Sequence, residues 1–303
     1  TQFVKPGDHA DQFPSERLLN SVQPLTYYKT AKAINAFHPD LFISNYWMTF
    51  FGPSMGTVAR KLKPGIKKIA VLHNVIPHEK RFFDSAANRY FLNNHDGFIV
   101  LSDAVEKDLL KLKPDAKVLK IDHPVYSHFG ERIPRSEAME QLNLNPEKKT
   151  ILFFGIIRDY KGLDLLLDAF AKLGDTYQLV VAGESYGSFE KYTNQIKELD
   201  IAGRIYLFNR YVSDQEVPAF FSAADVCVLP YKSATQSGIT AISHHFGVPV
   251  IATDVGGLKE TIKHNKTGLI VAEPDVGLIA QAVESYFSED NRTRFSAQIE
   301  ADN

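Results

Sequence analysis

Residues 151–164 read Ile-Leu-Phe-Phe-Gly-Ile-Ile-Arg-Asp-Tyr-Lys-Gly-Leu-Asp. The apolar run Ile151–Phe154 predicts a strand buried on both faces, and Gly155 marks a close approach of the backbone where that strand ends. A helical pattern begins near Gly162 and continues through Leu163–Leu173. A buried strand followed at once by a helix is half of a βαβ unit, so this segment favours a parallel α/β sheet.

The same alternation of short apolar runs and helical patterns recurs along the chain. The runs predicted as strands are Leu41–Ser44, Lys68–Leu72, Gly97–Leu101, Val118–Ile121, Ile151–Phe154, Gln178–Ala182, Ile205–Phe208, Val226–Leu229, Val248–Ala252 and Gly268–Val271. The helices predicted between them include Leu25–Phe37, Asp103–Leu112, Leu163–Leu173, Glu190–Leu199, Ser213–Ala223 and Leu278–Ser285. This pattern predicts α/β architecture with parallel sheets.

A chain of 303 residues is longer than one hydrophobic core usually fills, so two domains are expected. Residues 123–149 contain no strand pattern, carry three prolines and have one helical segment, Arg135–Leu142. We therefore expect a first domain at 1–125, a linker at 126–148 and a second domain at 149–303. Two parallel-sheet domains predict a ligand between the carboxyl ends of their strands. A dehydrogenase, a sugar-nucleotide epimerase or a periplasmic-type binding protein would fit that architecture equally well.

Composition narrows the class of protein. The single cysteine, Cys227, excludes an intramolecular disulfide and clustered-cysteine metal sites, and its apolar run predicts a buried small side chain. There is no apolar run near the ~20 residues of a membrane span and no signal peptide, so a cytoplasmic location is expected. Net charge is −2, but residues 1–120 carry 17 Lys and Arg against 11 Asp and Glu. That excess predicts an anionic partner for the first half, such as a membrane surface; solvated surface lysines are the alternative.

The loop after Phe154 carries the strongest chemical signal. Arg158 and Lys161 place two cations beside a helix N-terminus, whose N–H groups also favour an anion. Arginine offers a fork and lysine a point charge, so together they predict a diphosphate clamp. The alternative is a surface turn in which Arg158 pairs with Asp159 or Asp164.

Two further segments have the same strand–loop–helix form. The first, Tyr231-Lys-Ser-Ala-Thr-Gln-Ser-Gly-Ile239, offers the N–H groups of Gln236, Ser237 and Gly238 to a phosphate, or is a plain helix cap. The second, Gly247–Glu260, runs from a strand through a glycine pair into a helix carrying Glu260. In the first half, His73 follows a strand at its active edge, where a lone histidine is more often structural.

These segments together resemble the retaining GT-B glycosyltransferases, specifically the family 4 enzymes that include sucrose-phosphate synthases and bacterial mannosyl- and glucosyltransferases. The matching elements follow the family order over roughly 120 residues: Phe154-Gly155…Arg158…Lys161-Gly162, Val181–Glu184, Ala223–Pro230, Gly247–Glu260 and Asn265–Val271. The first half matches less sharply, through Val71-Leu-His73 and Val100-Leu-Ser-Asp103.

The resemblance implies a GT-B fold, in which two Rossmann-like domains face each other across a cleft. It implies that Arg158 and Lys161 hold the donor diphosphate and that His73 lies near the transferred sugar, making these three the catalytic set. The implied donor-binding residues are Gly155, Glu184, Tyr211, Val212, Gln236, Ser237, Gly238 and Glu260, with the backbone near Tyr211 and Val212 at the base. No metal and no cofactor are expected, because the cations stand in for a metal.

The implied substrates are a nucleotide-diphosphate sugar and a hydroxyl acceptor, namely a saccharide, glycolipid or polysaccharide precursor. By resemblance the anomeric configuration is retained through front-face attack, with the leaving diphosphate accepting the acceptor's proton. We expect no nucleic-acid partner, since the chain lacks a concentrated basic stripe. Peripheral association with the inner face of a membrane, through the basic first domain, is also expected.

The sequence departs from the family at two places. The family usually has two glutamates before the Gly-Val-Pro-Val strand. Here the first position holds Ala234 and the second holds Ile242, or Ser243 if a one-residue gap is allowed. The polar start and the absence of a clear returning helix after Phe287 suggest truncation at both ends. The missing glutamates leave a catalytically weak nucleotide-sugar binder as one alternative. A dinucleotide-dependent oxidoreductase is the other, disfavoured because neither domain shows Gly-x-Gly-x-x-Gly after its first strand.

Overall fold

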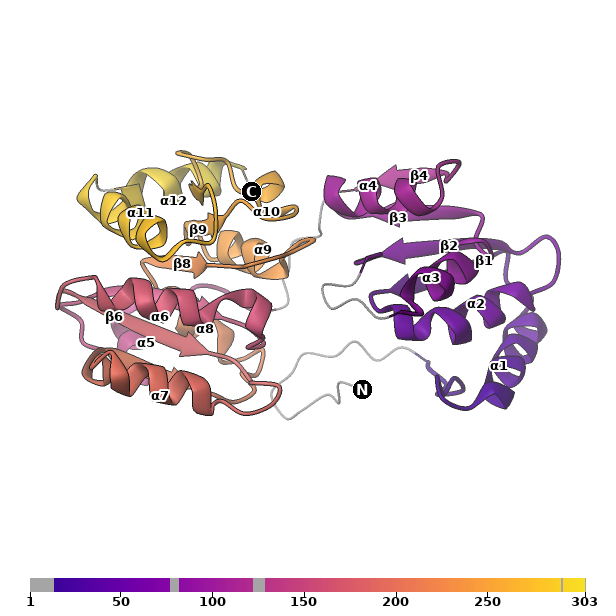
Figure 1. Ribbon diagram of the computed structural model, residues 1–303, viewed down its shortest axis with the longest axis horizontal. Coiled ribbons are helices and arrows are strands. Elements are labelled where there is room, and N and C mark those ends of the chain that lie inside the picture. Colours follow the sequence, from indigo (N-terminus) through magenta and orange to yellow (C-terminus); the bar gives the residue numbers. More distant parts are fainter. Residues whose placement is uncertain (1–13, 77–81, 122–128, 290, 303) are drawn as a thin grey trace. The chain divides into compact units, whose positions relative to one another are not determined.

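The structure is a computed structural model that describes residues 14–76, 82–121, 129–289 and 291–302. The chain divides into two compact units, Gln12–His123 and Pro124–Asn303, whose helices and strands are labelled in Figure 1. The expected domain boundary at 125–126 lies outside the described residues.

The first unit is built on a four-stranded parallel sheet with the strand order β1-β2-β3-β4. The strands are β1 (Leu41–Tyr46), β2 (Lys67–Leu72), β3 (Gly97–Val100) and β4 (Val118–Lys120). The helices are α1 (Pro24–Phe37), the short 3-10 helix η1 (Thr49–Phe51), α2 (Gly52–Arg60), α3 (Asp84–Leu92) and α4 (Asp103–Leu112). Each strand lies next to its predecessor in the chain, so this sheet grows in one direction only.

That direction of growth decides which face of the first sheet is covered. Because crossovers between parallel strands are right-handed, α2, α3 and α4 all pack on the same face. The core there includes Tyr46, Leu72 and Phe98, all buried. On the other face, Ile43 and Leu119 are 54% and 60% exposed. Within the described part of this unit, one face of the sheet is therefore packed and the other is open.

The second unit contains a six-stranded parallel sheet with the order β10-β9-β8-β5-β6-β7. Its strands are β5 (Lys149–Phe154), β6 (Tyr177–Ala182), β7 (Ile205–Phe208), β8 (Val226–Leu229), β9 (Val250–Thr253) and β10 (Gly268–Val271). Its helices are α5 (Arg135–Gln141), η2 (Asp159–Lys161), α6 (Leu163–Ala171), α7 (Glu190–Glu198), η3 (Ala202–Arg204), α8 (Val217–Ala223), α9 (Gly238–His245), α10 (Leu258–Thr261), α11 (Val276–Ser288) and α12 (Asn291–Asp302).

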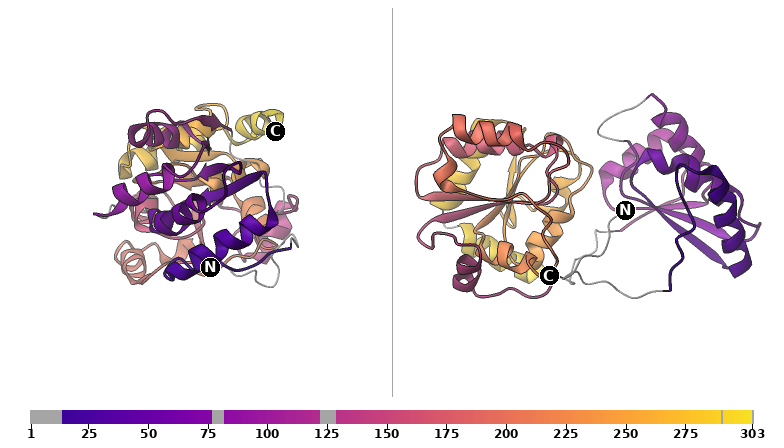
Figure 2. Two further views of the ribbon diagram at one scale, coloured as in Figure 1. Left: turned by 90° about the vertical axis from the view of Figure 1, so that its right-hand side faces the viewer. Right: turned by 90° about the horizontal axis from the view of Figure 1, so that it is seen from below.

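The order of this second sheet reverses at β5, which pairs with both β6 and β8. The connections before and after the reversal consequently lie on opposite faces. One core contains side chains of α6, α7 and α11, and the other contains side chains of α5, α8 and α9. Figure 2 shows helical layers on both sides of this sheet. A reversal of this kind is where α/β sheets bind ligands, outside the carboxyl ends of the strands.

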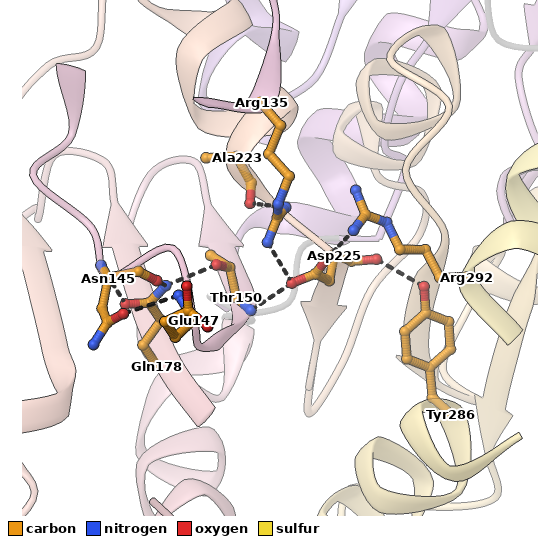
Figure 3. A network of polar contacts seen from close by, with 9 residues as sticks. All are labelled: Arg135, Asn145, Glu147, Thr150, Gln178, Ala223, Asp225, Tyr286 and Arg292. Atoms are coloured by element: carbon orange, nitrogen blue, oxygen red, sulfur yellow. Dashed lines mark hydrogen bonds and ion pairs between the residues drawn. The ribbon is translucent and has the colours of Figure 1, made fainter. Parts of the chain in front are cut away.

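Asp225, at the amino end of β8, binds the first and the last helix of the second unit, α5 and α12 (Figure 3). Its carboxylate accepts hydrogen bonds from Thr150 N at 2.6 Å and from Arg135 Nη2 of α5 at 2.9 Å, and it pairs with Arg292 of α12. The Tyr286 hydroxyl donates to the Asp225 carbonyl at 2.7 Å. Two guanidinium groups compensate one buried carboxylate, so α5 and α12 are fastened at the edge opposite to the carboxyl ends of the strands.

The α/β prediction is confirmed, and all ten predicted strands are present with bounds that differ by two residues at most. Cys227 is buried, as predicted, and burial raises the pKa of its thiol to about 12. One prediction about a helix is wrong. The expected helix Ser213–Ala223 begins only at Val217, because the Glu216 carboxylate accepts hydrogen bonds from the backbone and hydroxyl of Ser213 in a preceding turn.

At the end of the chain, where no clear returning helix was predicted after Phe287, the structure has α12. This helix packs within the second unit and buries Phe295 and Ile299. The predicted linker helix is present as α5, and it packs against α8. In the described ranges, every helix is too short or too polar to cross a lipid bilayer.

Candidate functional site

The loops that follow β5, β6, β7, β8 and β9 lie along one edge of the second sheet, because all six of its strands are parallel. Every predicted donor-binding residue belongs to one of these five loops or to the helix that the loop begins. The site therefore follows from topology before any side chain is considered.

The β5–α6 loop brings Lys161 back over the end of the strand that precedes it. Gly155 has a φ of +103°, and a Cβ built on it would lie 3.3 Å from Lys161 Nζ and 3.1 Å from Ile239 Cδ1. The Lys161 ammonium also lies 5.5 Å from the centre of the Tyr231 ring. Gly155, Lys161 and the first residues of α9 therefore meet at one point, where a larger residue at position 155 would crowd the lysine.

Lys161 is a half-buried cation without a carboxylate partner. No Asp or Glu in the described ranges lies within ion-pair distance of it. Burial lowers the pKa of Lys161 to about 8, the nearby Cys227 thiol opposes that shift, and the charge of Arg158 adds to it. Burial and the neighbouring positive charge both disfavour the protonated form of Lys161. A bound anion would therefore stabilise that form.

Arg158, on the same loop, is also free of carboxylates in the described part of the chain. Its guanidinium stacks on the ring of Tyr186 at 4.5 Å. The two aspartates that a surface-turn reading would give it are engaged elsewhere. Asp159 pairs with Lys191 and lies 3.8 Å from Lys232, whose ammonium also donates to Asp164 at 2.6 Å. Arg158 thus makes neither ion pair that the surface-turn alternative requires.

The β8–α9 loop supplies backbone donors beside these cations. Ser237 caps α9, since its Oγ accepts a hydrogen bond from Ile239 N at 3.3 Å, as the plain-cap alternative predicts. The Tyr231 hydroxyl lies 3.3 Å from the same Oγ. Within the described chain, the N–H groups of Gln236, Ser237 and Gly238 have no hydrogen-bond acceptor. The buried Oε1 atom of Gln236 also has no partner there.

The remaining donor-side residues lie on neighbouring loops that are tied to one another. Glu184 is exposed, and its carbonyl accepts from Ile157 N at 2.9 Å, which joins the β6 loop to the β5 loop. Ser185 N donates to Asn209 Oδ1 at 3.1 Å, which brings in the β7 loop that carries Tyr211 and Val212. Gly257 N donates to the Thr235 carbonyl at 3.1 Å, so the segment leading to the exposed Glu260 packs beside Gln236.

His73 belongs to the first unit, whereas the predicted donor-binding residues all belong to the second. It follows β2 directly, its N–H donates to the Tyr46 carbonyl at 2.8 Å, and its Nε2 lies 3.4 Å from Asn45 Oδ1. The neighbouring side chain of Asn74 has a buried Oδ1 atom without a partner in the described residues. The loop after β2 is held by Asn88, whose Nδ2 donates to the Val75 carbonyl at 2.6 Å.

Sequence reasoning missed several residues of this site. The rings of Tyr186 and Tyr231 contact Arg158 and Lys161, respectively. The Lys232 ammonium pairs with Asp159 and Asp164. Tyr231 and Lys232 belong to the loop segment Tyr231–Ile239, but an ion pair between residues 164 and 232 has no local sequence pattern. Only the adjacency of β5 and β8, which are distant in sequence, makes it visible.

One family model and several known proteins resemble this chain. A family model described as glycosyl transferases group 1 matches residues 134–301. A lipopolysaccharide core biosynthesis mannosyltransferase of Rhizobium meliloti is 31% identical over 179 residues, which cover 56% of this chain and 49% of that protein. A D-inositol 3-phosphate glycosyltransferase of Mycobacterium marinum is 26% identical over 264 residues, covering 82% of this chain and 55% of that protein. The chain thus spans about half the length of these curated relatives.

Solved structures of similar fold are found as well. Sucrose-phosphate synthase from Thermosynechococcus elongatus superposes with a TM-score of 0.79 at 20% identity, covering 92% of this chain and 73% of that one. HepE from Anabaena, in complex with UDP, gives a TM-score of 0.80 at 16% identity and covers 91% of this chain and 76% of that one. Together with the two parallel-sheet units, these likenesses confirm the predicted GT-B fold.

Proposed function

We propose, because this chain belongs to the glycosyl transferases group 1 family, that it moves a sugar from a nucleotide-diphosphate donor to a hydroxyl acceptor. The observation that carries the proposal is a pair of cations, Arg158 and Lys161, held without carboxylate partners in the described chain beside the free N–H groups that begin α9. Fixed donors that need no rearrangement are what a developing negative charge requires.

The chemical role proposed for this pair is to bind the diphosphate and to stabilise the charge that grows on it as the glycosidic bond breaks. Arg158 supplies a planar fork and Lys161 a compact charge, and the start of α9 adds oriented N–H dipoles. Binding of an anion would favour the protonated form of Lys161, whose pKa is held near 8 by burial. We propose that these groups serve in place of a metal ion.

The finer mechanism is also a proposal. Retention of the anomeric configuration would follow from front-face attack, in which the acceptor hydroxyl gives its proton to the leaving diphosphate. His73 would lie near the transferred sugar, from the first unit. Tyr211 and Val212 would hold the base through their backbone, and Gly155, Glu184 and Glu260 would line the remaining donor contacts.

Gln236 is the residue proposed to replace the family's acidic pair. The two alternative positions for the second glutamate lie inside the second unit. Ile242 and Ser243 are buried, and the Ser243 hydroxyl donates to the Val248 carbonyl at 2.8 Å. Gln236, in contrast, has a buried amide oxygen with no partner in the described chain. A buried amide oxygen that accepts no hydrogen bond costs free energy until a donor group arrives, and a ribose hydroxyl would supply one.

The missing acidic pair also favours a second candidate, a nucleotide-sugar binder with little turnover. A panel of UDP-, GDP-, ADP- and dTDP-sugars separates the two. Calorimetry identifies which nucleotide binds, and release of that nucleotide in the presence of saccharide or glycolipid acceptors reports transfer. Binding without release under any acceptor would favour the binder, and no binding of any nucleotide would contradict both.

Peripheral attachment to an anionic membrane remains a proposal for the first unit. A groove of about 430 Å³ in that unit is lined by Lys32, Lys61 and Lys63 together with Tyr28 and Asn35. Lysines within a Debye length of anionic headgroups each contribute roughly 1 kcal/mol. Sedimentation with vesicles of phosphatidylglycerol, compared with phosphatidylcholine, tests this; equal binding to both would contradict it.

A further inference from the structure

Two loops that are far apart in sequence are joined beside the proposed diphosphate site. The β5–α6 loop carries Arg158 and Lys161, and the β8–α9 loop leads to Ser237. Lys232 N donates to the Tyr160 carbonyl at 2.7 Å, and the rings of Tyr160 and Tyr231 meet edge to face at 6.2 Å. The loops are therefore in contact immediately before each reaches its proposed phosphate-binding groups.

Gly162 shows how closely the two loops approach. It has a φ of +68°, and a Cβ on it would lie 2.0 Å from the Pro230 carbonyl oxygen, so no larger residue fits there. This contact and the hydrogen bond from Lys232 N fix η2, the single turn that ends in Lys161. The position of the Lys161 ammonium is consequently set by the β8–α9 loop as well as by its own.

The same place holds two carboxylates that would oppose an anionic ligand. Asp159 and Asp164 flank Lys161 in the chain. The Lys232 ammonium donates to Asp164 Oδ2 at 2.6 Å and lies 3.8 Å from Asp159 Oδ2. Asp164 Oδ1 is buried and has no hydrogen-bond partner in the described residues. Among those residues, Lys232 is the cation that pairs with this carboxylate.

We propose that Lys232 is a positioning residue of the donor site, which ties the two loops together and neutralises Asp164 so that Lys161 and Arg158 keep their charge for the ligand. This inference rests on the proposed function, in that the ligand is the diphosphate of the donor. An unpaired carboxylate at Asp164, three residues after Lys161 in the chain, would act in two ways. It would repel the diphosphate, and it would offer Lys161 an internal partner in place of the ligand.

Four variants of the full chain test the role of Lys232, with UDP as the probe and calorimetry as the measurement. Lys232→Met keeps most of the side-chain volume and removes the charge, and we expect UDP to bind about tenfold more weakly. Adding Asp164→Asn to that variant removes the uncompensated carboxylate and should return the affinity to within about threefold of the parent. Lys232→Arg should bind like the parent. Lys263→Met, which breaks an exposed ion pair with Asp302 elsewhere in the second unit, is the matched control.

The double variant separates neutralisation from simple tethering. If Lys232 only held the loops together, Asp164→Asn would not restore binding to Lys232→Met, and that result would overturn the proposal. An unchanged affinity in Lys232→Met would overturn it as well. The two side chains of this ion pair are 33% and 31% exposed, so solvent screens it, and melting temperatures of all variants should lie within about 2–4 °C of the parent.

A second measurement does not depend on any nucleotide. NMR titration of ¹³Cε-labelled lysine follows the Lys161 ammonium, which lies near Arg158, Cys227 and Tyr231. Its midpoint should rise in Lys232→Met, because a nearby unpaired carboxylate favours the charged form, and it should fall back in the double variant. An unmoved midpoint would contradict the proposal. If the parent binds no nucleotide, the proposed function fails, whereas this titration still decides the role of Lys232.

Discussion

Arg158 and Lys161 could be predicted as anion-binding residues, because both follow a buried strand and precede a helix N-terminus. The sequence could not predict that neither residue forms an ion pair with Asp159 or Asp164. In the sequence these aspartates are the nearest partners, and the structure gives them to Lys191 and Lys232 instead. Ion pairs between residues about 30 and 70 positions apart depend on which strands are neighbours, and a local pattern does not contain that information.

The first prediction at this scale is that Arg158→Ala and Lys161→Ala each reduce donor turnover strongly without unfolding the protein. Each removes a charge-assisted contact to the leaving diphosphate, so kcat/KM should fall by about 2–4 kcal/mol in transition-state free energy. Neither side chain has an ion pair within the described chain to lose, so the melting temperature should change little. Steady-state kinetics and thermal unfolding measure the two effects. Parent-like turnover in the double variant would contradict the clamp.

A second prediction concerns pH. Burial lowers the pKa of Lys161 to about 8, so the ammonium is present below that pH and is lost as the pH rises through it. The affinity for UDP should accordingly fall by about tenfold between pH 7 and pH 9. Lys161→Arg keeps its charge throughout, and its affinity should be flat over the same range. A parent profile as flat as that of Lys161→Arg would show that Lys161 does not titrate against the ligand.

At the scale of the element, strands were easier to predict than helices. The buried strands of both sheets are continuous apolar runs, and their signal is strong. Helix α2 was missed because its sequence, Gly-Pro-Ser-Met-Gly-Thr-Val-Ala-Arg, has poor helix propensity. Its glycines serve packing: a Cβ on Gly52 would lie 2.7 Å from the Ala87 carbonyl oxygen, and one on Gly56 would lie 2.8 Å from the Tyr90 ring. Tertiary contact with α3 overrides the local preference.

The open face of the first sheet gives a third prediction. Ile43 lies on that face and Leu72 on the packed face, with exposed fractions of 54% and 0%. Leu72→Ala should lower the free energy of unfolding by about 2–5 kcal/mol, whereas Ile43→Ala should cost less than about 1 kcal/mol. Trp47, the only tryptophan of the chain, follows β1 and reports this unit by fluorescence in a urea titration. Equal losses for the two variants would show that the face is covered in solution.

A fourth prediction belongs to the start of α9. Gln236 places a neutral amide on the loop whose residues Tyr231 and Ile239 lie near Lys161, in a site proposed for an anion. Gln236→Glu adds a carboxylate there, and repulsion of the diphosphate should weaken UDP binding by roughly tenfold. Gln236→Met, which keeps the size without the charge, shows how much of the loss comes from the amide contact alone. Tighter binding by Gln236→Glu would mean that the diphosphate lies elsewhere.

For the molecule as a whole, the two units differ in how much of the function could be predicted. In the second unit the strand order reverses at β5, and five loops with recognisable residues converge at one edge. In the first unit the strands run in simple order, and the site rests on one histidine. Acceptors differ far more than nucleotide diphosphates do, so the residues that contact them follow no general pattern. The order of the motifs therefore predicted the fold, which is confirmed, and a donor side, which stays a prediction, but it did not predict the acceptor.

The last prediction concerns the separate roles proposed for the two units. If the first unit presents His73 to the transferred sugar while the second unit alone binds the nucleotide, then the two properties separate by mutation. His73→Ala should reduce kcat by roughly 10–100-fold while the affinity for UDP stays within about twofold of the parent. The contacts of His73 in the first unit include a backbone hydrogen bond to Tyr46 and a side-chain contact with Asn45, both in strand β1.

The control for that variant is His38→Asn, since His38 is an exposed histidine of the same unit whose left-handed backbone, with a φ of 53°, suits asparagine. It should leave both kcat and UDP affinity unchanged. Kinetics with a saturating acceptor and calorimetry with UDP measure the two quantities independently. A loss of UDP affinity in His73→Ala as large as its loss of kcat would place His73 at the nucleotide. Unchanged turnover would mean that the reacting sugar lies beyond the reach of His73, and the acceptor side would then have to be sought on another loop of the first unit.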